Sequence, residues 1–141
     1  MPGWGVQLPP NRVLRELHRL GFAATELGPP GFLPEEPGRL RTLLAGHGLR
    51  LVAAFAAAVL HEPARPQGEM RALDRAARQL AAAGGEVLVL AAATGAAGYD
   101  RGRDLDEASW GHLLEGVSRA ETLAAAQGLT LALHPHYGTA I

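Results

Sequence analysis

The segment nearest the C-terminal end carries the residues best suited to chemistry. Residues 134–139 read His-Pro-His-Tyr-Gly-Thr and follow an apolar run directly. Two imidazoles two positions apart at a strand end can project to the same side, where they can bind a divalent metal, hold a substrate hydroxyl or shuttle protons. Pro135 has no N–H for a sheet ladder and marks where a strand gives way to a loop. We expect His134 and His136 to contact a ligand; the alternative is a pair of structural histidines hydrogen-bonded at a turn.

Three further side chains are candidates for the same site. Glu26 follows a short apolar stretch and precedes Gly28 and two prolines. Its carboxylate is expected to contact either a substrate or a catalytic histidine. The alternative is a structural carboxylate paired with an arginine. His61 comes directly after the apolar run 49–60 and is expected to reach a substrate from a loop. Trp4 lies in an N-terminal segment that could overhang the same site.

The residues that are missing exclude several mechanisms. All 13 basic side chains are arginine, so neither a Schiff-base lysine nor a P-loop lysine is possible. The chain has no cysteine, which excludes disulfides, thiolate nucleophiles and cysteine zinc sites and fits a reducing, cytoplasmic setting. A net charge of −1 gives no electrostatic reason to expect a nucleic acid or an anionic membrane as partner. The longest apolar run, of ten residues, is too short to span a bilayer, and the N-terminus does not resemble a signal peptide.

Periodic apolar positions predict four helices that would hold these residues in place. The helices are expected over 12–20, 35–46, 69–83 and 107–127, with Asn11 and Asp106 as N-caps of the first and the last. Glycines at 21, 48, 85 and 128 follow the four helices and are expected to end them.

Each of these glycines is followed by a short apolar stretch of strand length. The expected strands are Phe22–Leu27, Leu49–Phe55, Glu86–Ala92 and Leu129–His134. The alternation of helix, glycine, apolar strand and loop predicts parallel β/α units. The sequence contains about four such strands, whereas a closed β/α barrel needs eight. The expected fold is therefore α/β, a partial (β/α)₈ barrel formed as a single domain by residues 1–141.

The alternation of side chains along each strand predicts which residues face the barrel interior. The leucines at 129, 131 and 133 share one face, suited to a helical cover, whereas Ala132 and His134 share the other. By the same parity, Ala24 and Glu26 point inward. The polar candidates would then meet at the carboxyl ends of the strands, where parallel α/β proteins gather their ligands.

Three segments of the sequence resemble a known family. Residues 4–10 (WGVQLPP), 24–28 (ATELG) and 131–139 (LALHPHYGT) are similar to the xylose-isomerase-like TIM barrels, which include sugar phosphate isomerases/epimerases and inosose dehydratases. The resemblance extends over essentially the whole chain, and the histidine segment is its most specific part.

The resemblance implies a function and a cofactor. Members of the family move protons next to a carbonyl of a sugar or polyol, and they hold a divalent metal, Mn²⁺, Mg²⁺ or Co²⁺, at the carboxyl-end rim. Glu26 and His61 would serve as catalytic groups, His134 and Trp4 as substrate contacts and His136 as a metal ligand. The usual two glutamates, one aspartate and one histidine of the metal set have no full counterpart here. The alternative is a non-catalytic half-barrel that pairs with a partner or with itself as a homodimer.

Overall fold

The computed structural model describes residues 6–63, 66–96 and 102–141, with helices and strands in strict alternation. The order is α1 (Pro10–Arg19), β1 (Ala24–Glu26), α2 (Pro37–Gly46), β2 (Arg50–Ala58), α3 (Pro66–Ala82), β3 (Val87–Ala92), α4 (Glu107–Ala126) and β4 (Thr130–Leu133). All four predicted helices and all four predicted strands are present. β2 continues three residues past its predicted end at Phe55.

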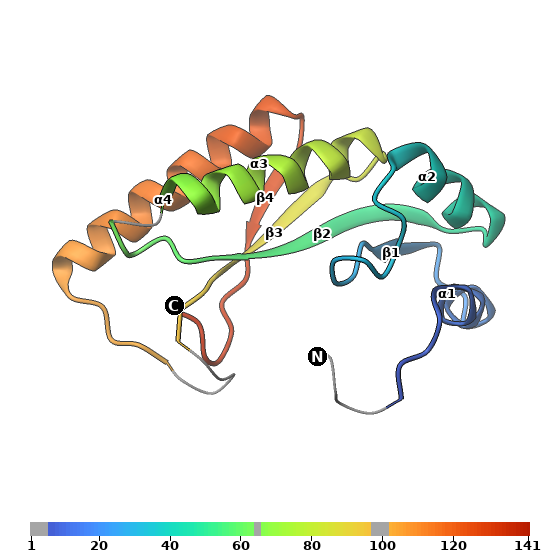
Figure 1. The fold of residues 1–141 in the computed structure, drawn as a ribbon, viewed down its shortest axis with the longest axis horizontal. Coiled ribbons are helices and arrows are strands. Elements are labelled where there is room, and N and C mark those ends of the chain that lie inside the picture. The colour runs from blue at the N-terminus through green and yellow to red at the C-terminus, as the bar shows by residue number, and fades with distance from the viewer. Residues whose placement is uncertain (1–5, 64–65, 97–101) are drawn as a thin grey trace.

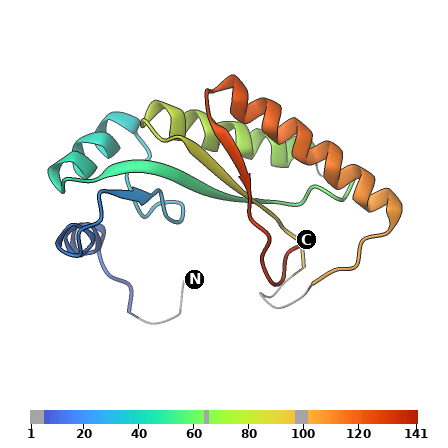
Figure 2. The same ribbon diagram turned by 180° about the vertical axis from the view of Figure 1, so that it is seen from behind.

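The four strands form one parallel sheet in the order β1-β2-β3-β4. Neighbouring strands are thus consecutive in the sequence, as in a β/α barrel. Glu26 pairs in register with Ala53, Ala53 with Val87, and Val87 with Thr130. Helices α2, α3 and α4 cover one face, while α1 lies beside β1 at the edge of the sheet (Figures 1 and 2). The predicted α/β class and partial parallel barrel are confirmed.

The helix starts follow local hydrogen-bonding chemistry. Glu36 caps α2, because its carboxylate accepts hydrogen bonds from the N–H groups of Gly38 and Arg39, each at 2.7 Å. Asp106 caps α4 as predicted, accepting from the Ser109 N–H at 2.8 Å. The predicted cap at Asn11 is wrong. The helix begins two residues earlier than predicted, at Pro10, with Pro9 in the cap position. The fixed φ of proline suits a first helical position, and proline has no N–H that would need a partner there.

Two consecutive glycines, Gly84 and Gly85, follow α3 and have different structural roles. Gly84 has a φ of +84° and ends the helix in the left-handed conformation. Gly85, predicted to be the terminating residue, serves another purpose, because a Cβ there would lie 2.1 Å from Leu80 Cδ1. Gly85 therefore lets the chain pass close over α3 as it enters β3.

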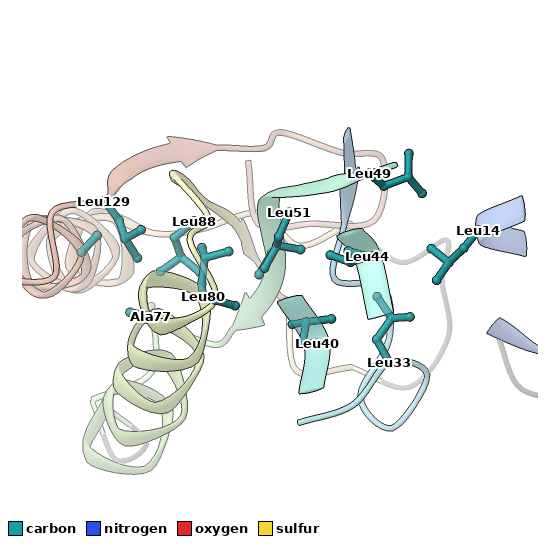
Figure 3. Packing of buried hydrophobic residues seen from close by; sticks show 13 residues of the cluster. Leu14, Leu33, Leu40, Leu44, Leu49, Leu51, Ala77, Leu80, Leu88 and Leu129 are labelled. Carbon is teal, nitrogen blue, oxygen red and sulfur yellow. The ribbon is translucent and has the colours of Figure 1, made fainter. Parts of the chain in front are cut away.

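The hydrophobic core lies between the sheet and its helices. Leu51 of β2, Leu88 of β3 and Leu129, the residue before β4, are all at most 6% exposed. They form one cluster with Leu40 of α2 and Leu80 of α3 (Figure 3). The predicted outward parity of Leu129 is therefore confirmed. Among the described residues, no helix combines the length and apolar character needed to cross a membrane.

Candidate functional site at the carboxyl ends of the strands

A cavity of about 490 Å³ opens at the carboxyl ends of β2, β3 and β4 on the face away from the helices. Its floor is formed by small side chains of β2 and β3, including Ala57 and Ala91. Phe55, Thr94, His134 and His136 also line it. A cavity of this size, apolar with a few converging polar groups, is typical of small-molecule sites.

Three rings form one contiguous cluster in this cavity. The ring centroids of His134 and His136 are 5.6 Å apart and the rings are stacked at 28°. The Phe55 ring meets that of His134 edge-on, at 5.9 Å and 84°. The two histidines thus project to the same side, as their spacing predicted.

Backbone hydrogen bonds join both ends of the loop that carries the histidines to β3. The His134 N–H donates to the Leu90 carbonyl and the Ala140 N–H to the Ala92 carbonyl, both at 2.8 Å. Between them, the Thr139 N–H donates to the His136 carbonyl at 2.9 Å, and the Thr139 hydroxyl lies 2.6 Å from the carbonyl oxygens of both His136 and Ile141. These bonds close a tight turn, so the imidazoles are held against the sheet by backbone rather than by a flexible loop.

The side chain of His136 is oriented by its own loop. Its Nδ1 lies 2.5 Å from the carbonyl oxygen of Tyr137, so Nδ1 carries the proton and donates. The Nδ1 proton of His136 is therefore held within the loop itself.

The other predicted residues lie elsewhere. Glu26 ends β1, with β2 and β3 between it and β4, and it lines a second hollow together with Gln7 and Phe32. His61 is 1% exposed and does not line the cavity of about 490 Å³. Its Nε2 lies 3.9 Å from Glu62 Oε1, and that carboxylate also binds Arg103 at 3.1 Å. Trp4 lies outside the described residues. The structure therefore brings His134 and His136 together, but not Glu26 or His61 with them.

Two residues of the site were missed from the sequence. Phe55 is 52% exposed on the open face of β2, although an apolar run predicts burial. Its signal was an aromatic ring among alanines, at the parity that faces the interior. Thr94 follows β3 and lines the cavity, 5% exposed, with its hydroxyl accepting from the Ala96 N–H at 3.3 Å.

The described residues do not fit a complete divalent-metal site. In the part of the chain that the structure describes, no three histidine, aspartate or glutamate side chains are grouped to hold an ion. A metal lies in the plane of each imidazole that binds it, and the nearly parallel rings of His134 and His136 do not converge on a shared ion. A metal held here would need ligands in addition to these two side chains.

The parallel strand order, the helical cover and the polar groups at the strand ends define a protein of the β/α-barrel class. The sequence pattern of the family described as "Xylose isomerase-like TIM barrel" matches residues 14–141, so the chain belongs to that family.

Individual relatives agree with this assignment. The chain is 26% identical over 149 residues to an inosose dehydratase of Geobacillus kaustophilus (strain HTA426), covering 100% of this chain and 48% of the relative. It superposes with a TM-score of 0.71 on a family 2 AP endonuclease from Brucella melitensis, at 19% identity, covering 94% of this chain and 54% of the other. A 3-keto-D-glucoside 4-epimerase from E. coli gives a TM-score of 0.69 at 16% identity, covering 96% and 54%. The chain thus spans about half the length of these relatives, and the structural likenesses describe the fold.

Proposed function

We propose that this chain supplies part of the rim of a barrel that binds a small sugar or polyol derivative and transfers a proton next to its carbonyl. The reaction class is that of an isomerase, an epimerase or a dehydratase. The observation that supports this most directly is the cluster of Phe55, His134 and His136 around a cavity of about 490 Å³. Family membership and the sugar-handling relatives support the same reading.

The cluster has the features that sugar recognition requires. A sugar presents an apolar face of C–H groups and a rim of hydroxyls. The exposed ring of Phe55 can contact the apolar face, while the imidazoles exchange hydrogen bonds with the hydroxyls. The small side chains of Ala57 and Ala91 leave room above the sheet for the ligand.

The proposed chemistry is general acid–base catalysis. Removing the proton from the carbon beside a carbonyl moves an electron pair into an enediol-like intermediate. A base must accept that proton, and an acid must return it to the neighbouring position. We assign His134 a contact with substrate hydroxyls and Glu26 the proton-transferring role, while His136 is the expected metal ligand.

Glu26 and His61 stay predictions as catalytic groups. Glu26 would have to act from the second hollow, on a ligand that reaches across β2. Buried His61 would act through Glu62, whose Oε1 lies 3.9 Å from its Nε2. A comparison of Glu26→Gln and His61→Gln separates these roles: a catalytic role lowers turnover, whereas a structural role lowers only the free energy of unfolding.

A divalent metal, Mn²⁺, Mg²⁺ or Co²⁺, is also part of the proposal, with His136 contributing one ligand through Nε2. When bound, such an ion would polarise the substrate carbonyl. Because a single imidazole is a weak ligand, the 141-residue chain should bind Mn²⁺ only weakly, and His136→Ala should abolish the residual affinity in isothermal titration calorimetry. Unchanged affinity in that variant would remove the ligand assignment.

Direct titration with sugars tests the proposed function. The probes are D-tagatose, D-fructose and an inosose, followed by calorimetry and by saturation-transfer NMR. We expect one of them to bind, and Phe55→Ala and His134→Ala to weaken binding at least about tenfold, equivalent to ~1.4 kcal/mol. The matched control is His112→Ala on the exposed side of α4, which should bind like the parent. No binding by any probe, or equal losses in the control, would refute the proposal.

A further inference from the structure

We infer that the side-chain hydroxyl of Thr94 binds one hydroxyl group of the sugar and so helps to determine which sugars the cavity accepts. Thr94 follows β3 and lines the cavity of about 490 Å³ together with its neighbours Gly95 and Ala96. The inference rests on the proposed function, because it names a group that would distinguish one sugar from another at the same site.

The burial of Thr94 is unusual for a polar side chain. In residues 6–63, 66–96 and 102–141, the buried polar side chains are those of His61 and Thr94, and of these two only Thr94 lines this cavity. Thr94 is 5% exposed. A hydroxyl that is removed from water loses its hydrogen bonds to water, so it needs a partner in the protein or in a ligand. A valine would fill the same space without that requirement.

The protein gives this hydroxyl one weak partner. Thr94 Oγ1 accepts a hydrogen bond from the Ala96 N–H at 3.3 Å, which is longer than the usual range of about 2.7–3.2 Å. The turn does not require this bond, because Gly95 has a φ of +76° and adopts the left-handed conformation by itself. A hydroxyl has one proton to donate and two lone pairs. Within the described residues, the bond from Ala96 uses one lone pair and leaves the proton for a ligand.

Thr94 is also held in a fixed position relative to the histidine loop. The His134 N–H donates to the Leu90 carbonyl at 2.8 Å, which joins the end of β4 to β3. Further along the same two segments, Ala93 and Thr139 form an antiparallel bridge. Thr94 is the residue after this bridge, so its backbone cannot move far from the histidines. A fixed hydroxyl can select a ligand group by position, because little ordering is needed when the ligand binds.

The spacing along β3 indicates which end of a sugar meets Thr94. Leu90 is in register with Leu133, so His134 lies at the level of Ala91. Three residues of extended chain, about 10 Å, separate that level from Thr94. A six-carbon sugar chain with its terminal oxygens is of comparable length. With His134 on the hydroxyls beside the reacting carbonyl, Thr94 would meet a hydroxyl at the opposite end of the sugar.

Deoxy sugars and two variants of Thr94 test the inference. The probes are D-fructose and D-tagatose, each with its 1-deoxy and 6-deoxy derivatives, titrated by calorimetry. Thr94→Val should weaken binding of both sugars and of their 1-deoxy derivatives at least about tenfold, because it removes the hydrogen-bonding group. Binding of the 6-deoxy derivatives should be weak in the parent and unchanged by Thr94→Val, since these compounds lack the hydroxyl that Thr94 binds. Thr94→Ser keeps the hydroxyl and should bind like the parent.

A control on α4 accounts for effects of the substitution itself. Thr122, whose hydroxyl donates to the Ser118 carbonyl at 3.0 Å, is exposed, so Thr122→Val makes the same chemical change outside the cavity and should leave sugar binding unchanged. Circular dichroism should show that each variant is folded.

The outcomes separate this inference from the proposed function. Unchanged binding in Thr94→Val, or an equal loss for the 6-deoxy and 1-deoxy derivatives, would overturn the role of Thr94 while leaving the proposed function intact. Binding of an inosose but of neither D-fructose nor D-tagatose by the parent would have the same meaning. If the parent binds none of these compounds, the proposed function fails and the inference fails with it.

Discussion

The carboxylate of Glu36 shows at the residue scale how one side chain starts a helix and makes it sensitive to acid. Hydrogen bonds from the N–H groups of Gly38 and then Arg39 hold the pKa of Glu36 below its ordinary value of 4.5. A lowered pKa in the folded state stabilises the fold at pH values above 4.5, and this contribution is lost as the pH falls through the folded-state pKa.

Glu36→Gln should therefore lower the thermal midpoint at pH 7, and the difference from the parent should vanish as the pH falls below the folded-state pKa. Thermal unfolding followed by circular dichroism between pH 2 and 7 measures this. Asp106, whose pKa is lowered by the Ser109 hydrogen bonds, should behave in the same way at the start of α4. A difference that persists at pH 2 would show that the charge of Glu36 is not what stabilises the cap.

Thr139 holds the histidine loop through one hydroxyl. That hydroxyl lies 2.6 Å from the carbonyl oxygens of His136 and Ile141, and the residue is half-buried. Thr139→Val keeps the shape and removes the donor, so it should cost about 1–2 kcal/mol in the free energy of unfolding. The NMR ring signals of His134 and His136 should shift with it. Thr139→Ser, which keeps the hydroxyl, serves as the control; if it is as unstable as the valine variant, the hydrogen bond is not the cause.

At the scale of elements, two glycines of α4 allow the effect of close packing on stability to be distinguished from the effect of helix propensity. A Cβ at Gly116 would lie 2.9 Å from Leu60 Cβ, whereas one at Gly111 would meet nothing within 4 Å. Gly116→Ala should therefore destabilise the fold by about 1–3 kcal/mol through overpacking. Gly111→Ala should stabilise it by about 0.5–1 kcal/mol, because alanine is the better helix former. Urea unfolding of both variants measures the difference, and equal effects would show that α4 does not press on Leu60.

At the scale of the whole molecule, the core between the sheet and its helices should supply more stability than the open face of the sheet. Leu88 of β3 is 0% exposed and belongs to the same buried cluster as Leu51, Leu80 and Leu129 (Figure 3), whereas Phe55 of β2 is 52% exposed on the other face. Leu88→Ala should lower the free energy of unfolding by about 2–5 kcal/mol, because it leaves a cavity in this core. Phe55→Ala, the control, should lower it by much less. Urea unfolding measures both variants, and equal losses would contradict this difference between the two faces.

The sequence by itself determined the alternation of helices and strands, the cap at Asp106 and the pairing of His134 with His136 on one side. These features depend on residues that lie close together in the chain. The spacing of apolar residues and the side chains that cap a helix determine such local structure directly. The tertiary structure alone decided that His61 is buried and that Glu26 is separated from the histidines by two strands. Those outcomes depend on which strands become neighbours in the sheet and on how each loop folds over it. The local spacing of apolar and polar residues determines neither of these.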